Sequence, residues 1–441
     1  MKKTIVVFAL ILLLISPIAL FAAGGQEEAP AAQAAAPSAN YVPAEKVTLN
    51  FWHSYSGPRA LLFESLVKEF MAENPMIEIK LTYGGNLFTM RDKLLTAVGG
   101  GSGPDIAEID SFWTPIFADA GALTDLAPYM AATDYDTTDL MDACLASISY
   151  KDKFWSIPFN LSNIVLYYNK KMFKEAGLNP EAPPTTWDQV MEYGKKLTRD
   201  RNNDGVIDQW GITFPVKANF GSVWYWLAFF WQQGGELYNA EQTTTTFNSP
   251  AGVAATNMWR DMVWKHKILN LSAGFSDFKA GNAAMELNSS SVLGNYRDEM
   301  GNANIGLAPL PPGPTGIRAT VSGGGNLAIL TGCKDPQAAW LFLTWLGSTE
   351  VNKRWCLATG ALPTRKSVLS SKEYQDYLLS DPKNKIMLDG LEFTRIRPNI
   401  YQYADTSRYI PLAVEKALFE NLDPQPLLDA AKVEADQLFK K

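Results

Sequence analysis

Residues 46–110 have the sequence KVTLNFWHSYSGPRALLFESLVKEFMAENPMIEIKLTYGGNLFTMRDKLLTAVGGGSGPDIAEID, and this stretch decides the fold. Two of its segments, 46–52 and 77–81, alternate apolar and polar residues with the period of a β-strand, and a third strand is expected at 105–110. Leu62, Leu66 and Phe70 recur every four residues and predict a helix, and a second helix is expected over 91–98. The order β-α-β-α-β predicts a parallel sheet that is covered by helices.

A binding site is expected at one edge of this sheet. In open parallel sheets, ligands bind in the crevice beyond the carboxyl ends of the strands. Three loops lie at that edge of the predicted sheet: 52–57, 83–87 and 110–113. They contain aromatic and short polar side chains, so they are candidates for the recognition of a small polar molecule.

The rest of the chain predicts a second α/β unit. A chain of 441 residues is too long to fold around a single hydrophobic core. It is expected to pass from the first unit to the second near 156–163. Further elements are expected downstream, as strands at 164–169 and 327–330 and as helices at 185–197, 223–233, 250–264 and 335–346. The sequence therefore predicts an α/β protein with two lobes.

Composition excludes several classes of protein. Apolar residues make up 47% and charged residues 19%, which is typical of a globular chain and not of a disordered one. The 39 Lys and Arg residues against 46 Asp and Glu give a net charge of −7, so a nucleic-acid partner is not expected. The two histidines, His53 and His266, are too few for a histidine-rich metal site or catalytic centre.

The N-terminus predicts export to the periplasm or another extracytoplasmic space. Lys2 and Lys3 precede an apolar run over 5–21, and small residues of the kind found at cleavage sites follow this run. The pattern is typical of a signal peptide at 1–23. An uncleaved membrane anchor is the alternative, because the run is just long enough to span a bilayer. The residues that follow the apolar run include no cysteine to which a lipid could be attached. Residues 24–46 are rich in Ala and Pro and are expected to form a tether.

The cysteines leave two interpretations open. Cys144, Cys333 and Cys356 are an odd number, so at least one thiol is unpaired in an exported protein. Buried free thiols are favoured over a bridge between Cys333 and Cys356. A thiol nucleophile is not expected, because the sequence offers it no convincing histidine partner.

A series of stretches along the chain carries a family pattern: FWHSYSGP (51–58), FMAENPMIEIKLTYGGN (70–86), GSGPDIAEID (101–110), FADAGALTDL (117–126), IPFNLSNIVLYYNKKMFKEAGL (157–178), PPTTWDQV (183–190), DQWGI (208–212), FWQQGGELYN (230–239) and TGALPT (359–364). In this order they resemble the family 1 extracellular solute-binding proteins, the receptor subunits of ABC-type sugar importers. The resemblance extends over essentially the whole mature chain. It implies the periplasmic-binding-protein fold, in which crossing hinge segments join two α/β lobes and solute binds in the cleft.

The resemblance also implies a division of the chain and a mode of action. Lobe 1 is expected to comprise 47–157 and 322–358, and lobe 2 is expected to comprise 158–320 and 363–441. Crossing segments are expected near 157–162, 320–321 and 357–363. By the same resemblance, the lobes close on the solute, and the closed, monomeric receptor docks on membrane permease subunits driven by a cytoplasmic ATPase.

The FWHS and TYGGN segments are similar to the glycerol-3-phosphate-binding branch of this family. Ser162, a serine at Ser289–Ser290, a glycine at Gly323–Gly324 and Arg397 match its site pattern. Other positions depart from it, since tyrosines are replaced by Leu87 and Ala361 and a glutamate by Ser111. Because both tyrosines are absent, the expected solute is a sugar or oligosaccharide. Glycerol-3-phosphate or a glycerophosphodiester is the alternative.

A sugar site needs flat aromatic side chains for the C–H faces and short polar groups for the hydroxyls. The candidate platforms are Trp52, Tyr55, Trp113, Trp224 and Trp226, and the candidate polar partners are Asn86, Asp110, Asn160, Ser162, Asn288, Ser289, Ser290 and Arg397. Gly323 and Gly324 would let backbone amides approach the ligand. The alternatives are core packing for each tryptophan, helix capping for Asp110, and a lobe-packing charge for Arg397, which would contact an anion if the ligand carries phosphate.

Residues 200–208 resemble the first half of a calcium-binding loop. Asp200, Asn202 and Asp204 occupy its first three ligand positions, Gly205 follows them, and Asp208 is a further candidate. Gly211 stands where a bidentate glutamate belongs, so a polar turn is favoured over a weak structural calcium site. No other cofactor is expected.

The sequence therefore predicts a receptor and not an enzyme. It has no G-x-S-x-G, H-E-x-x-H, P-loop or G-x-G-x-x-G motif. A secreted glycoside hydrolase, with its paired carboxylates, is the rival from another class. For the receptor, Trp113→Ala is expected to weaken sugar binding strongly and to leave folding nearly intact.

Overall fold

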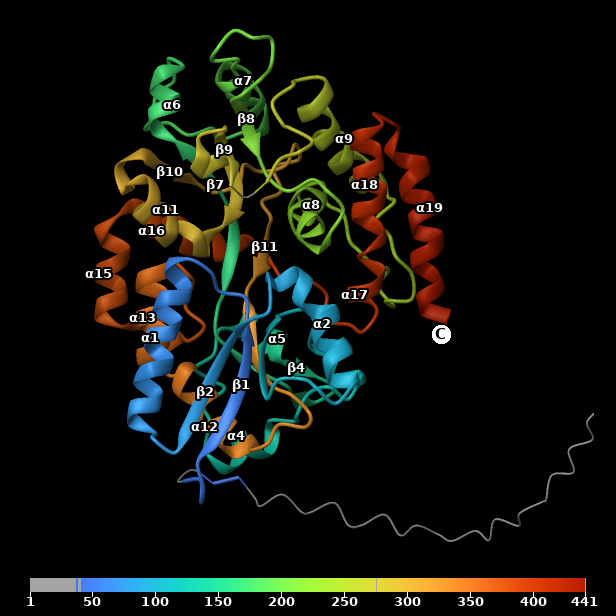
Figure 1. Ribbon diagram of the computed structural model, residues 1–441. Helices are drawn as coiled ribbons and strands as arrows, with labels where there is room; N and C mark the ends of the chain where they lie inside the picture. Colours follow the sequence, from blue (N-terminus) through green and yellow to red (C-terminus); the bar gives the residue numbers. More distant parts are fainter. Residues whose placement is uncertain (1–36, 39–40, 275, 441) are drawn as a thin grey trace, which may run out of the picture. The chain divides into compact units, whose positions relative to one another are not determined.

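The computed structural model describes residues 37–38, 41–274 and 276–440 (Figure 1). The predicted signal peptide and most of the predicted tether lie outside this range. The end of the tether belongs to the folded unit, because the Tyr41 hydroxyl donates a hydrogen bond to Asp335 and Pro43 is buried. Over the described part of the chain, no helix combines the length and the apolar character needed to cross a membrane.

The first sheet forms the centre of lobe 1. Its strands lie in the order β2-β1-β3-β12-β6, with bounds β1 Val47–His53, β2 Ile77–Tyr83, β3 Ile106–Asp110, β6 Ile157–Pro158 and β12 Gly325–Ile329. β1 pairs in parallel with β2 and β3, as the β-α-β-α-β order predicts, and β12 pairs antiparallel to β3. Leu49, Phe51 and His53 alternate along β1 and point into the core, which explains the period-two pattern.

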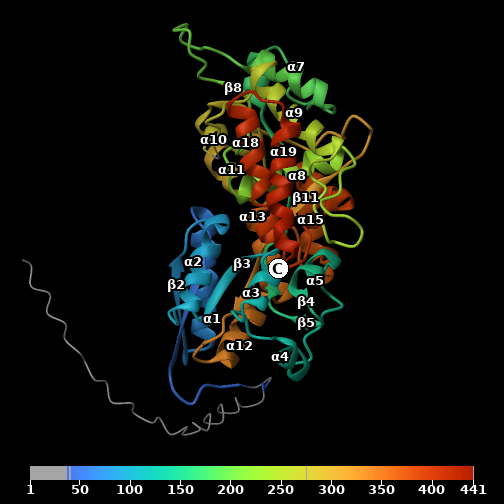
Figure 2. The ribbon, with the colours of Figure 1, turned by 90° about the vertical axis from the view of Figure 1, so that its right-hand side faces the viewer.

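Helices cover this sheet, and Figure 2 shows α1 and α2 beside β2. The lobe 1 helices are α1 Pro58–Glu73, α2 Leu87–Gly99, α3 Thr114–Asp119, α4 Ala127–Ala132, α5 Asp142–Ile148, α12 Pro336–Leu346, α13 Thr349–Thr359, α14 Lys366–Ser370 and α15 Lys372–Ser380; a hairpin of β4 Ser149–Tyr150 and β5 Lys153–Phe154 follows α5. α1 buries Phe63, Leu66, Val67 and Phe70 against the sheet, and Pro58 is compatible with its first turn.

The second sheet forms the centre of lobe 2. Its strands lie in the order β13-β11-β7-β9-β8, and β10 also pairs with β7; their bounds are β7 Ser162–Asn169, β8 Trp210–Thr213, β9 Ala283–Ser289, β10 Ile305–Ala308, β11 Thr320–Gly323 and β13 Thr394–Arg395. β7 and β9 are buried along almost their whole length, so they show no alternation.

The lobe 2 helices are α6 Lys170–Glu175, α7 Trp187–Leu197, α8 Phe220–Gln232, α9 Pro250–Trp264, α10 Asp277–Ala280, α11 Leu293–Met300, α16 Pro382–Asp389, α17 Tyr403–Thr406, α18 Tyr409–Phe419 and α19 Pro424–Asp436. Four 3₁₀ turns complete the described elements: η1 Ser290–Val292, η2 Asn302–Asn304, η3 Gly390–Phe393 and η4 Gln437–Lys440. α18 and α19 lie side by side and pack on α9 (Figures 1 and 2).

The chain crosses between the lobes close to the predicted positions. β6 pairs in the first sheet and β7 in the second, so one crossing runs through 159–161. A single residue, Gly324, separates β11 in the second sheet from β12 in the first. The third segment passes Leu362, which pairs with Leu161.

The third crossing differs from the expected division of the chain. Val368 of α14 and Tyr374 of α15 pack in the same hydrophobic cluster as β1 and α1, and Arg365 forms an ion pair with Asp139. Residues 366–380, which were expected in lobe 2, therefore pack with lobe 1. The chain returns to lobe 2 at α16, where Met387 packs with Tyr167 of β7.

The three cysteines are free thiols. Cys144 and Cys356 are buried, and Cys333 is partly buried. Burial raises the pKa of the Cys144 and Cys333 thiols to about 12. The structure therefore agrees with buried free thiols for two of the three and shows no bridge between Cys333 and Cys356.

Candidate functional site

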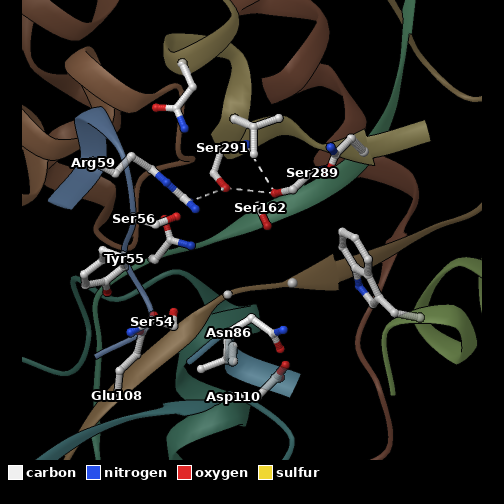
Figure 3. Close-up of a pocket in the computed structure, with 18 of the residues that line it drawn as sticks. Ser54, Tyr55, Ser56, Arg59, Asn86, Glu108, Asp110, Ser162, Ser289 and Ser291 are labelled. Atoms are coloured by element: carbon white, nitrogen blue, oxygen red, sulfur yellow. Dashed lines mark hydrogen bonds between the residues drawn. The ribbon is translucent and has the colours of Figure 1, made fainter. Parts of the chain in front are cut away.

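A cavity of about 340 Å³ lies between the lobes and is lined by side chains from both (Figure 3). Lobe 1 supplies Ser54, Tyr55, Ser56, Arg59, Tyr83, Asn86, Leu87, Glu108 and Asp110; lobe 2 and the crossing segments supply Asn160, Ser162, Trp224, Tyr225, Lys279, Asn288, Ser289, Ser291, Val292, Asn295, Tyr296, Gly323, Gly324 and Arg397. Its volume is in the range that suits a small ligand.

The lobe 1 wall is built from the loops that follow parallel strands. Ser54 to Arg59 follow β1, Asn86 follows β2, and Asp110 ends β3. Asn86 also caps α2, because its side-chain oxygen accepts a hydrogen bond from the Thr89 backbone N–H at 3.1 Å. The general rule for parallel sheets thus accounts for this half of the cavity.

Two glycines bring bare backbone to the cavity wall. Gly324 has φ +144°, and a Cβ there would lie 1.8 Å from the Asn160 carbonyl oxygen. A Cβ on Gly323 would lie 2.8 Å from the Trp224 ring and 3.0 Å from Ser162 Oγ. A side chain at Gly324 would collide with the backbone of the crossing segment 159–161, and one at Gly323 would collide with Trp224 of α8 and Ser162 of β7.

Arg397 and Asp110 form a buried ion pair in the cavity wall. Asp110 is 2% exposed and Arg397 is 3% exposed. The guanidinium also lies 4.0 Å over the ring of Phe112, and its Nε and Nη1 have no hydrogen-bond partner among the described residues. Burial raises the pKa of Asp110, and the charge of Arg397 opposes that rise.

A second buried carboxylate, Glu108, lies two residues before Asp110 on β3 and also lines the cavity. Its Oε2 accepts hydrogen bonds from the Ser54 backbone N–H at 2.8 Å and from Ser54 Oγ at 2.7 Å. Burial raises the pKa of Glu108, and the hydrogen bonds from Ser54 act in the other direction. Glu108 therefore fixes the loop after β1 and presents an acceptor to the cavity.

A hydrogen-bonded network behind the lobe 2 wall fixes Asn288. Asn288 Nδ2 donates to Tyr296 Oη at 2.9 Å, and Tyr296 Oη in turn donates to Glu286. The Asn288 oxygen accepts from the Ser289 backbone N–H at 2.7 Å and from Tyr225 Oη at 3.4 Å. These hydrogen bonds hold the Asn288 side chain in one orientation, so a ligand in the cavity meets it in a fixed geometry.

Glu286 makes the stability of this network sensitive to pH. Burial raises the pKa of Glu286 to about 8, above the ordinary value that it regains on unfolding. The folded state therefore holds one proton more than the unfolded state between about pH 4.5 and pH 8, so stability falls as pH rises through that window.

We expect Glu286→Gln to flatten this pH dependence, since the amide oxygen still accepts from Tyr296 but carries no charge. Thermal midpoints of wild type and variant, measured from about pH 5 to about pH 9, test this. The wild type should lose stability relative to the variant as pH rises. Parallel curves for the two proteins would contradict the assignment to Glu286.

Most of the predicted site residues line the cavity: Tyr55, Asn86, Asp110, Asn160, Ser162, Trp224, Asn288, Ser289, Gly323, Gly324 and Arg397. Trp224 is only 5% exposed and donates from Nε1 to the Ser322 carbonyl at 2.9 Å, so little of its ring is open to a ligand. Tyr83, which is 56% exposed, offers the more open aromatic surface.

Four predicted site residues require correction, because the structure places them outside the cavity. Trp113 is 0% exposed and stacks on Phe117, since the chain turns into α3 directly after β3. Trp226 is 1% exposed and donates from Nε1 to Thr256 Oγ1 at 3.0 Å.

The other two are Ser290 and Trp52. Ser290 is fully buried and accepts a hydrogen bond from the Asn163 backbone N–H at 3.3 Å. Trp52 is partly buried and packs against the cluster that contains Met90 and Leu94. Its side chain points to the face of β1 opposite Phe51 and His53, which is the face that α2 covers.

Sequence reasoning missed several lining residues: Ser54, Ser56, Arg59, Tyr83, Leu87, Glu108, Tyr225, Lys279, Ser291, Val292, Asn295 and Tyr296. Ser54, Ser56 and Tyr83 lie in loops that the sheet rule already selected, so their positions alone could have identified them. Of the lobe 2 residues, Tyr225 lies in α8, Lys279 lies in α10, and the others follow β9; none of these elements carries a pattern that marks a binding edge.

The predicted calcium loop forms a polar turn. Asp200 accepts hydrogen bonds from the backbone N–H groups of Asp204 at 3.2 Å and Gly205 at 2.7 Å. Asp208 forms an ion pair with Arg201. The described residues contain no group of three or more His, Cys, Asp or Glu side chains placed to hold a metal ion. The carboxylates are thus used within the turn, and a weak structural calcium site stays the alternative interpretation.

Comparisons with known proteins agree on the family. A family model for bacterial extracellular solute-binding proteins matches residues 57–353. The sn-glycerol-3-phosphate-binding periplasmic protein UgpB of Escherichia coli K12 is 29% identical over 418 residues, which cover 89% of this chain and 93% of that protein.

Solved structures share the fold. The cyclic alpha-maltosyl-1,6-maltose binding protein of Arthrobacter globiformis is 27% identical with a TM-score of 0.71, and 89% of this chain and 99% of that one are covered. A solute-binding protein of Thermotoga lettingae bound with alpha-D-tagatose is 24% identical with a TM-score of 0.80, at coverages of 89% and 99%. The chain belongs to the bacterial extracellular solute-binding proteins, and its two α/β lobes have the periplasmic-binding-protein fold.

Proposed function

We propose that this chain is the receptor of an ABC importer and that it binds a sugar or oligosaccharide in the cavity between its lobes. The observation that carries the proposal is the chemistry of the cavity walls. Hydroxyl and amide side chains enter from both lobes, with Ser54, Ser56 and Asn86 on one side and Ser162, Ser289 and Asn288 on the other.

These groups match a polyhydroxylated solute. A sugar hydroxyl both donates and accepts, so it needs partners of both kinds once water is removed. Amide and hydroxyl side chains supply both kinds, and Glu108 supplies a further acceptor. The rings of Trp224 and Tyr83, which also line the cavity, can contact C–H groups. The similarity to proteins that bind maltose-type sugars and tagatose supports the same class of solute.

The Arg397–Asp110 pair favours a sugar as the main candidate. The positive charge of Arg397 is already balanced by a buried carboxylate, so a bound anion is not needed to compensate it. The remaining N–H groups of Arg397 can donate to neutral hydroxyls. The expected roles of Arg397 as a lobe-packing charge and as a polar partner in the wall are therefore compatible.

Solute binding is proposed to act through lobe closure. A solute in the cavity contacts both lobes, and these contacts are lost when the lobes separate, so it shifts the population toward the closed state. Gly324 and segment 159–161 are the positions at which a small backbone rotation would move one sheet against the other. The closed receptor would then deliver its solute to the permease subunits of the importer.

The second candidate solute is glycerol-3-phosphate or a glycerophosphodiester. It is favoured by the unpartnered Nε and Nη1 of Arg397, which could bind phosphate oxygens, and by the similarity to UgpB. Against it, Leu87 lines the cavity at a position where the glycerol-phosphate pattern has a tyrosine.

A titration of the purified mature chain tests the proposal. Intrinsic tryptophan fluorescence and the thermal midpoint are followed with glucose, maltose, maltotriose and glycerol-3-phosphate, and the solutes are analysed for breakdown afterwards. At 100 times the dissociation constant, a bound sugar should stabilise the fold by about 2.7 kcal/mol. A response to glycerol-3-phosphate alone would establish the second candidate, and released product would overturn the receptor assignment in favour of a hydrolase.

A further inference from the structure

We propose that the solute carries an acidic group and that Arg59, together with Ser289 and Ser291, forms the subsite that binds this group. The inference rests on the proposed function and narrows it, from sugars in general to sugars that bear a carboxylate or a phosphate. Arg59, Ser289 and Ser291 lie together on one side of the cavity (Figure 3).

Arg59 is a cation that faces the cavity without an ion-pair partner in the described part of the chain. It is partly buried in the first turn of α1, and its Nη1 donates to Ser291 Oγ at a long 3.4 Å. Its Nε is shielded from solvent and has no hydrogen-bond partner among the described residues. Figure 3 shows the guanidinium extending from α1 toward Ser291 of the other lobe. A shielded N–H group without an acceptor is costly, so this geometry favours an external acceptor.

The two serines supply a further donor. Ser289 Oγ and Ser291 Oγ are 2.8 Å apart and share one hydrogen bond, which uses only one of their two hydroxyl protons. The Oγ of Ser291 accepts from Arg59, and the Oγ of Ser289 accepts from the Ser291 backbone N–H at 3.3 Å. The acceptor capacity of this pair is thus partly used, and one hydroxyl proton remains to be donated. An anion offers only acceptors, so it fits this arrangement better than a neutral hydroxyl does.

The charges around the cavity leave Arg59 without an ion-pair partner among the described residues. Arg397 is paired with Asp110, and Lys279 is paired with Glu299 at 2.7 Å. Glu108 is the remaining acidic group of the wall, but it forms no ion pair with Arg59 and accepts its hydrogen bonds from Ser54. Glu108 and Arg59 interact only at longer range: burial raises the pKa of Glu108, and the charge of Arg59 is a minor influence that lowers it. The open N-terminal turn of α1, which no side chain caps, adds a positive potential in the same direction.

An acidic group at this point would also couple binding to closure. Arg59 belongs to lobe 1, whereas Ser289 and Ser291 belong to lobe 2. A carboxylate or phosphate that accepts from both sides would replace the long 3.4 Å contact with short charge-assisted hydrogen bonds. These bonds exist only when the lobes are together, so the acidic group would stabilise the closed state specifically.

The test compares neutral solutes with their acidic counterparts. Dissociation constants are measured by calorimetry for glucose, glucuronate and glucose-6-phosphate, for glycerol and glycerol-3-phosphate, and for inorganic phosphate alone. Wild type is compared with Arg59→Gln and Arg59→Lys. Lys68→Gln is the matched control, because Lys68 is exposed on the same helix and its replacement removes the same charge outside the cavity. Unliganded thermal midpoints show that each variant folds.

We expect the acidic member of at least one pair to bind the wild type at least about tenfold more tightly than its neutral counterpart. Arg59→Gln should abolish this preference, Arg59→Lys should restore part of it, and Lys68→Gln should keep it. A preference for glucuronate over glucose-6-phosphate, or the reverse, identifies the acidic group as carboxylate or phosphate.

Other outcomes would overturn the inference. If neutral sugars bind and their acidic forms bind no better, the sugar receptor stands and the acidic subsite falls. If Arg59→Gln weakens neutral and acidic forms equally, Arg59 is a general cavity residue. If only inorganic phosphate binds, and only with Arg59 present, the subsite stands and the sugar assignment falls. Failure of every probe to bind would contradict both.

Discussion

Replacing Arg397 with methionine should lower the free energy of unfolding by about 3–5 kcal/mol, because Asp110 would stay buried without its partner. Asp110 is 2% exposed, and the other groups that donate to it are weak, with Ser111 Oγ and the Phe112 backbone N–H both at 3.4 Å. The same variant should also weaken solute binding, since Arg397 lines the cavity. Urea unfolding followed by circular dichroism measures the stability.

The loss of stability that Arg397→Met causes should depend on pH. Without the guanidinium, the pKa of the Asp110 carboxyl rises further above its ordinary value. The folded variant is therefore destabilised by the ionised, unpaired carboxylate only at higher pH. The deficit relative to wild type should therefore be larger near pH 8 than near pH 5. The double variant Arg397→Met with Asp110→Asn should recover part of the stability. If Arg397→Met alone were as stable as wild type, the Arg397–Asp110 pair would not contribute to the stability of the folded protein.

Trp113→Ala should destabilise the protein by about 3–5 kcal/mol, which is the usual cost of removing a large buried ring. Trp113 is fully buried, stacks on Phe117 with ring centroids 6.0 Å apart, and meets Phe112 at 5.9 Å. This reverses the expectation drawn from sequence, in which the same change weakened binding and spared the fold. Thermal unfolding and a solute titration on the same samples separate the two effects.

Trp113→Phe is the matched control for this prediction. It keeps an aromatic ring in the core and should lose only a fraction of the stability that alanine loses. Solute affinity should stay close to wild type in both variants, because Trp113 does not line the cavity. A large loss of affinity with little loss of stability would return Trp113 to the binding site.

Sequence periodicity predicted the framework because one face of most elements is buried. The helix expected at 250–264 has those bounds as α9, and the strand expected at 77–81 lies within β2. β9 gave no such signal, since its residues are buried on both faces and do not alternate. The assignment of 366–380 to lobe 2 failed for a different reason: the lobe against which a short amphipathic helix packs depends on contacts such as Tyr374 with the lobe 1 core.

The candidate site was predictable to the extent that it follows from strand ends. The sheet rule selects the loop after β1 and so places Ser54 and Ser56 near a ligand, whereas Arg59 lies just beyond that loop in α1. It cannot show that Arg59 meets Ser291, because 232 residues separate them and only the folded lobes bring them together. It also cannot show whether a tryptophan near a strand end, such as Trp113, points into the cleft or the core.

The state of the cysteines has a consequence for labelling chemistry. Thiols react with maleimides as thiolates, and groups with a pKa of about 12 provide almost none at neutral pH. Cys144 and Cys356 are in addition shielded by the core. A cysteine introduced at the exposed cavity position Tyr83 would therefore be the most reactive thiol of the folded chain. A single environment-sensitive dye attached there would convert the receptor into an optical sensor for its own solute, without prior removal of the native cysteines.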